Sequence, residues 1–66
     1  MKTFYDIQQF LKKYGTIIYM GDRAADLEVM EEEIRELYQA QLIDPKDYQT
    51  AILLLRQEAR LLKEKN

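Results

Sequence analysis

The chain has 66 residues, a formal net charge of −2 and a pI of about 5.0, and it contains neither Cys nor His. Such a length predicts a single domain, over residues 1–66, that buries only ~60% of the surface exposed by its unfolded chain. The composition excludes disulfides, thiolate or imidazole metal sites, and mechanisms based on a Cys nucleophile or a His base. No apolar run approaches the ~20 residues of a membrane helix and no secretion signal is evident, so we expect a cytoplasmic protein.

A first helix is predicted over residues 4–14. Thr3 and Asp6 have the spacing of a capping box, and Gly15 is a stop signal. At 100° per residue one broad apolar face is predicted to enter the core; it contains Phe4, Ile7, Phe10, Leu11 and Tyr14. Tyr5, Gln8 and Lys12 lie on a flank that we expect to be exposed.

Residues 15–21 form an apolar segment between two glycines. Its β-branched and aromatic residues are typical of a strand, but no partner strand is evident elsewhere in the chain. We therefore expect an ordered connector in which Ile17, Ile18 or Tyr19 closes one end of a helical bundle. The alternative is an edge that pairs with a strand from a partner.

A second helix is predicted over residues 23–41, capped by Asp22 and free of Gly and Pro. Its apolar stripe is spaced by three and four residues and consists of Leu27, Met30, Ile34, Leu37 and Tyr38. The acidic cluster Glu28, Glu31, Glu32, Glu33 and Glu36 is interpreted as a solvated face, because helical carboxylate metal sites use His as well. No metal or cofactor is expected.

The third helix is predicted over residues 45–63. Asp44 can cap it, Pro45 suits the first helical position, and Asp47 has the spacing of a capping-box partner. Its main apolar face comprises Tyr48, Ala51, Ile52, Leu55, Ala59 and Leu62. Tyr14, Tyr38 and Tyr48 are all expected in the core with their hydroxyls at its rim.

Leu54 and Leu61 form a second apolar ridge on this helix, about 100° from the first, and Leu53 falls on the polar side. One neighbour cannot cover both ridges. The helix must therefore contact two helices, or one helix and another copy of the protein.

Charge alternates along the chain: residues 1–21 carry +2, residues 22–44 carry −6 and residues 45–66 carry +2. If the first and third helices are neighbours, their cations could join exposed tyrosines in one surface. Exposed aromatic rings beside cations are what a single-stranded nucleic acid site needs. The candidate residues are Tyr5, Gln8, Lys12, Lys13, Tyr19, Arg56, Arg60 and Lys63.

The segments Thr3-Phe4-Tyr5-Asp6, Gly21-Asp22-Arg23, Glu33-Ile34-Arg35-Glu36-Leu37-Tyr38 and Ile43-Asp44-Pro45 resemble the YqgQ-like family of short cytoplasmic proteins from Gram-positive bacteria. The resemblance covers nearly the whole chain. It implies a three-helix bundle and a role in binding single-stranded DNA or RNA. Residues 37–55 also resemble helical-hairpin modules that oligomerise or act as scaffolds.

The sequence thus predicts an all-α, compact three-helix bundle. No nucleophile–base–orienter set is apparent, so we expect neither an enzyme nor a small-molecule substrate. Because of the family resemblance, the favoured function is binding of single-stranded nucleic acid. The alternative is a protein partner or self-association through Leu53, Leu54 and Leu61.

Overall fold

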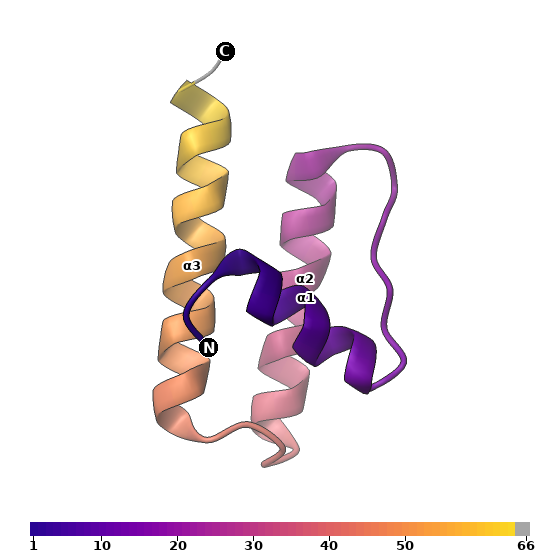
Figure 1. The fold of residues 1–66 in the computed structure, drawn as a ribbon, viewed down its shortest axis with the longest axis vertical. Helices are drawn as coiled ribbons and strands as arrows, with labels where there is room; N and C mark the ends of the chain where they lie inside the picture. Colours follow the sequence, from indigo (N-terminus) through magenta and orange to yellow (C-terminus); the bar gives the residue numbers. More distant parts are fainter. Residues whose placement is uncertain (65–66) are drawn as a thin grey trace.

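The computed structural model describes residues 1–64 and contains three helices: α1 (Phe4–Lys13), α2 (Arg23–Gln39) and α3 (Pro45–Glu64). The predicted all-α three-helix bundle is confirmed, and residues 1–64 contain no strand. Helices α2 and α3 form an antiparallel pair, and α1 crosses this pair and contacts both members (Figure 1). The connector, residues 15–21, runs outside the helices from the end of α1 to the start of α2 (Figure 1).

Each helix begins where its capping residue predicts. The Asp6 N–H donates to Thr3 Oγ1 at 3.2 Å, while Asp6 Oδ2 accepts from the Thr3 N–H at 3.1 Å, which completes a capping box. Asp22 accepts from the Ala24 N–H at 3.0 Å, and Asp44 accepts from the Asp47 N–H at 2.8 Å. These carboxylates satisfy backbone donors that have no partner within the helix.

The carboxylate of Asp47 does not complete the capping box predicted for α3. Its Oδ1 instead accepts from the amino group of Met1 at 3.2 Å. An Asp side chain is shorter than Glu and reaches the backbone of the capping residue less readily. The Asp47 carboxylate therefore binds the nearby amino group of Met1 instead. The contact joins the segment before α1 to the first turn of α3.

Two helices end in the same hydrogen-bonded turn. After α1, the N–H of Thr16 donates to the carbonyl of Leu11 and the N–H of Gly15 donates to that of Lys12. After α2, Leu42 and Gln41 donate in the same way to the carbonyls of Leu37 and Tyr38. This Schellman pattern needs a left-handed residue, which is Gly15 (φ +81°) after α1 and Gln41 (φ +62°) after α2.

The predicted helix limits are therefore slightly long at two C-termini. Helix α1 ends at Lys13, with Tyr14 as its cap, and α2 ends at Gln39, two residues before the predicted limit. Gln41 gives no stop signal in the sequence because left-handed backbone is unusual for residues other than Gly. Helix α3 extends one residue beyond the prediction, to Glu64.

The core draws on all three helices and on the turn before α3. Its buried residues are Ile7, Leu11, Leu27, Met30, Ile34, Ile43, Ala51, Ile52 and Leu55. All but Ile43 belong to the predicted apolar faces. Tyr38 and Tyr48 are half-buried and stack on each other with ring centroids 4.0 Å apart.

One core prediction needs correction. Tyr14 is exposed and packs only along the side of the helix, against Phe10, because α1 has ended before it. The connector agrees with its prediction, because one of its three candidate residues, Ile18, packs on the core, whereas Ile17 and Tyr19 are largely exposed.

Arg23 links the three helices. It belongs to the first turn of α2, its guanidinium carbon lies 4.3 Å from the ring centroid of Phe4 in α1, and its Nη2 lies 3.5 Å from Glu58 Oε2 in α3. This arrangement places Glu58 on the side of α3 that adjoins α1.

Candidate nucleic-acid surface

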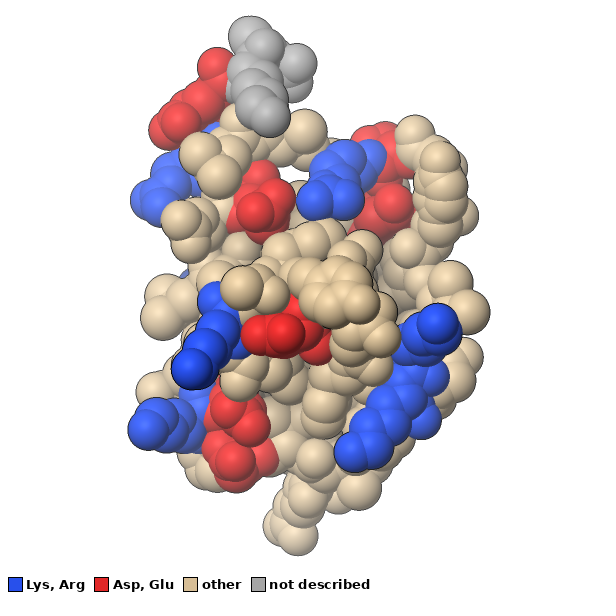
Figure 2. Space-filling model, viewed as in Figure 1, with Lys and Arg blue, Asp and Glu red and all other residues tan. Residues whose placement is uncertain are grey.

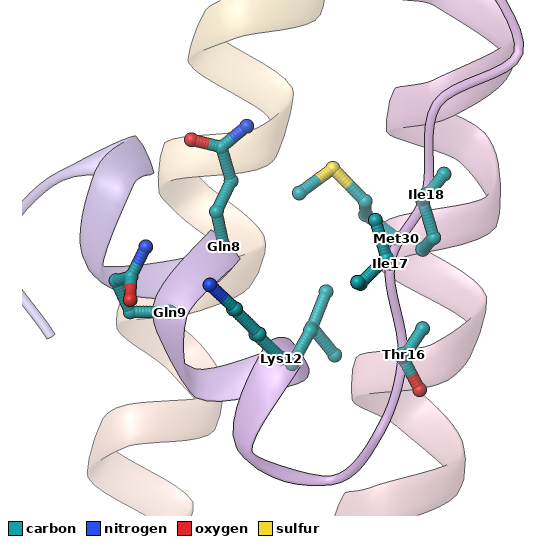
Figure 3. A pocket seen from close by; sticks show the side chains of 8 residues that line it. Gln8, Gln9, Lys12, Thr16, Ile17, Ile18 and Met30 are labelled. Carbon is teal, nitrogen blue, oxygen red and sulfur yellow. The ribbon is translucent and has the colours of Figure 1, made fainter.

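The exposed flank of α1 and the connector enclose a hollow of about 240 Å³ (Figure 3). Gln8, Gln9 and Lys12 lie on its α1 side, and Thr16, Ile17 and Ile18 lie on its connector side, as Figure 3 shows. Leu11 and Met30, which are both buried, line the hollow as well. The hollow therefore combines apolar surface with two amides, a hydroxyl and a cation.

Local structure explains why these side chains meet. One side of α1 carries Tyr5 and three residues that follow it at helical spacing. These are Gln8, Gln9 and Lys12, which lie three, four and seven residues after Tyr5. The left-handed turn at Gly15 then reverses the chain. As a result Thr16 and the residues after it return along the same side of α1.

Two of the candidate residues are strongly exposed aromatics. Tyr5 is 63% exposed and Tyr19 is 78% exposed. A neighbouring hollow is lined by Gln8, Tyr19 and Arg23 together with Asp26. Tyr19 thus lies close to the α1 flank. A side chain that stacks on the bases of a nucleic-acid strand bound to that flank needs such a position.

Lys12 and Lys13 form the last turn of α1 and are exposed. Both residues follow the aromatic and amide side chains along the helix. They bring the positive charge of the predicted site to the end of α1 at which the connector begins.

The cations of α3 lie elsewhere. Arg56 and Lys63 line a groove between α2 and α3 together with Glu28 and Glu31. Arg56 Nε lies 3.6 Å from Glu31 Oε1, and the other oxygen of Glu31 accepts from Arg35 at 2.7 Å. The Glu31–Arg35 pair has the spacing of four residues at which helical ion pairs form.

Helix geometry shows that these cations point away from α1. Arg56 and Arg60 are each two residues from Glu58, and positions two apart on an α-helix differ by about 200°. Since Glu58 faces the α1 side through Arg23, Arg56 and Arg60 face the opposite side of α3.

The eight candidate residues therefore fall into two groups. Tyr5, Gln8, Lys12, Lys13 and Tyr19 belong to α1 and the connector, and Arg56, Arg60 and Lys63 belong to the far side of α3. On the face crossed by α1, Lys and Arg occur in separate places with Asp and Glu between them (Figure 2). Helices α1 and α3 are neighbours, but contact between helices does not bring all their cations together.

The sequence prediction did not include Gln9 or Thr16, which also line the hollow. Helical spacing from Tyr5 and Lys12 could have identified Gln9. No sequence signal identifies Thr16, because its place depends on how the chain reverses at Gly15.

The proposed interface on α3 is only partly exposed. Leu53 is 67% exposed and Leu61 is 43% exposed, but Leu54 packs against the core. Helix α3 contacts both α1 and α2, which is one of the two outcomes that the sequence left open. Leu53 and Leu61 remain as candidate contact residues.

Residues 1–64 contain no group of three or more acidic side chains placed to hold a metal ion. Within the same residues, no helix combines the length and the apolar character that a membrane crossing requires.

Comparison with known proteins supports the resemblance seen in the sequence. The model of the YqgQ-like family matches residues 1–61. The chain is also 45% identical over 58 residues to a protein of Bacillus subtilis (strain 168) named "Uncharacterized protein YqgQ". That alignment covers 88% of this chain and 82% of the Bacillus protein.

Proposed function

The chain belongs to the YqgQ-like family, and from this premise and its surface we propose that it is a non-catalytic protein that binds single-stranded nucleic acid. The observation that carries the proposal is the pairing of two exposed tyrosines, Tyr5 and Tyr19, with the amides and cations of the α1 flank. Aromatic side chains beside a basic track provide a stacking surface that tolerates any base.

In this proposal each group has a distinct role. The rings of Tyr5 and Tyr19 stack on bases, and Gln8 hydrogen-bonds to a base or sugar at the hollow. Lys12 and Lys13 contact phosphates. Arg56, Arg60 and Lys63 form a second set of phosphate contacts, which only a strand passing round α3 reaches.

The test is a fluorescence titration of a labelled single-stranded oligonucleotide at several salt concentrations. Replacement of both Lys12 and Lys13 by Gln is expected to weaken binding. It is also expected to reduce the magnitude of the slope of log affinity against log salt by about 1.4, because each phosphate contact on a single strand contributes about 0.7 to that slope. The matched control replaces Lys2 and Lys46 by Gln, which changes net charge equally at two exposed positions outside the eight candidate residues. Equal losses in both variants would show that net charge alone drives binding.

The stacking role has its own control. Tyr5→Leu and Tyr19→Leu are each expected to cost about 1–3 kcal/mol of binding free energy, whereas Tyr5→Phe and Tyr19→Phe retain the ring and the affinity. Absence of any binding at low salt contradicts the proposal as a whole.

Exposure of Leu53 and Leu61 favours a second candidate function, interaction with a protein partner through α3. Leu53→Lys and Leu61→Lys are the appropriate variants because Leu54 also packs on the core. Light scattering of these variants would test self-association through this ridge, and a wild-type protein that stays monomeric at high concentration would exclude it.

A further inference from the structure

The connector has the form of an unpaired β-strand. Exposure alternates over residues 16–19: Ile17 and Tyr19 are both 78% exposed, while Thr16 and Ile18 are partly buried, and Met20 after them is 55% exposed. Positive φ occurs at Gly15 and Gly21 on either side but at none of residues 16–20. Figure 1 shows the connector as an extended run, and Ile18 on this run packs against the core while Ile17 and Tyr19 are exposed to solvent.

At each end of this run, a backbone N–H group is hydrogen-bonded to the rest of the protein. The Thr16 N–H donates to the carbonyl of Leu11 at 3.0 Å, and the Met20 N–H donates to Asp26 Oδ1 at 2.8 Å. Among residues 1–64, no hydrogen-bond partner is found for the N–H groups of Ile17, Ile18 or Tyr19.

These two hydrogen bonds identify which edge of the extended segment has unpaired backbone groups. In an extended chain the N–H and C=O groups of successive residues point to opposite edges. Thr16 and Met20 therefore share the edge that faces their own protein, and Ile17 and Tyr19 share the other. The outer edge offers two N–H groups and two carbonyls two residues apart, which is the pattern that an antiparallel strand pairs with.

We infer that residues 16–20 pair with the same segment of a second copy as an antiparallel two-stranded ribbon, with Ile18 on the two-fold axis. This register makes Ile17 and Tyr19 of one copy the hydrogen-bonded partners of Tyr19 and Ile17 of the other, with four backbone hydrogen bonds in all. It also sets each exposed aromatic ring against a β-branched side chain, a favourable cross-strand pair.

Other registers are less suitable. Both copies keep their cores on the same side of the ribbon only when outward residues pair with outward residues. Of the registers that satisfy this condition, only the one centred on Ile18 uses both free residues of each copy.

Charge complementarity favours a second copy as the occupant. Lys12 and Lys13 precede the connector, and Asp22 and Asp26 follow it. Antiparallel pairing brings the basic end of each segment beside the acidic end of the other, so that attraction operates twice in the dimer. The interface is isologous and closes at two copies.

The register can be tested by cysteine cross-linking, because the chain has no Cys of its own. An Ile17→Cys protein is mixed with a Tyr19→Cys protein in a thiol–disulfide exchange buffer. Cross-strand neighbours fall within disulfide geometry, so the mixed dimer is expected to exceed each homodimer by roughly tenfold. A twofold excess, as random collision gives, or a dominant 17–17 or 19–19 disulfide would overturn the inference.

Sedimentation over a range of protein concentrations tests the surface itself. The wild type is expected to form dimers, and the Ile17→Lys/Tyr19→Lys double variant to remain monomeric with an unchanged circular dichroism spectrum, since both side chains are exposed. Leu53→Lys is the control, because Leu53 has similar exposure on α3. A monomeric wild type would overturn the inference. So would a dimer that still forms in the double variant or that no longer forms in the control.

Neither the cross-linking nor the sedimentation measurement uses nucleic acid, so both results are independent of the proposed function.

Discussion

Asp6 shows how one side chain can anchor the start of a helix. Its carboxylate accepts from the N–H groups of Lys2 at 2.8 Å and Thr3 at 3.1 Å, and these hydrogen bonds lower the pKa of Asp6 below its usual value. A hydrogen bond to the charged form stabilises that form. The folded state therefore favours ionised Asp6 more than the unfolded state does.

The stability that Asp6 contributes depends on pH. Because the folded pKa is depressed, the stabilisation is complete above the unfolded pKa of about 4 and is lost as the pH falls through the folded value. We expect Asp6→Asn to lower the Tm at pH 7 but to change it little near pH 2, where the wild-type carboxyl is protonated too. Thermal unfolding followed by circular dichroism at both pH values would check this. An equal decrease at both would contradict it.

At the scale of the helical elements, α1 and α2 end in the same turn with different residues in the left-handed position. A Cβ added at Gly15 would meet no atom within 4 Å, so only backbone conformation opposes a side chain there. Gln41 adopts φ +62° despite its side chain. Left-handed backbone costs an L-residue about 1–2 kcal/mol, so the end of α2 is strained.

The two positions give a matched prediction. Gln41→Gly is expected to raise the free energy of unfolding by about 0.5 kcal/mol, since relief of strain exceeds the backbone entropy cost of glycine. Gly15→Ala is expected to lower it by about 1 kcal/mol. Urea unfolding of both variants would measure these changes. Destabilisation by Gln41→Gly would show that Gln41 makes a compensating contact.

At the scale of the whole molecule, stability depends on a small core shared by all three helices. Ile34 lies in α2 and is completely buried, as is Ile7 in α1. A domain of this size has a small free energy of unfolding. The removal of even one methylene from such a position should therefore be measurable.

Ile34→Val is expected to lower the free energy of unfolding by about 0.5–1.5 kcal/mol. The control is the same chemical change at an exposed position, Ile17→Val, for which we expect less than about 0.5 kcal/mol. Urea unfolding gives both values. Equal effects, measured at a dilution at which the chain is monomeric, would contradict the burial of Ile34.

Several features of this molecule are predictable from sequence because they are local. Thr3 with Asp6, Asp22, and Asp44 before Pro45 mark the three helix starts, and Gly15 marks the end of α1. The hydrogen bonds at these helix ends close within five residues, so the sequence around each one is enough. The apolar periods likewise identify the core faces and hence the three-helix bundle.

Only the tertiary structure decided how these elements face one another. Sequence could not show that Arg56 and Lys63 turn toward the glutamates of α2 while Lys12 turns toward the connector, or that Leu54 is covered while Leu53 is not. It also gave no sign that Gln41 would be left-handed or that Ile18 would be the one connector residue on the core. The direction in which each helix face points is set by packing between side chains distant in sequence, and no local signal encodes it.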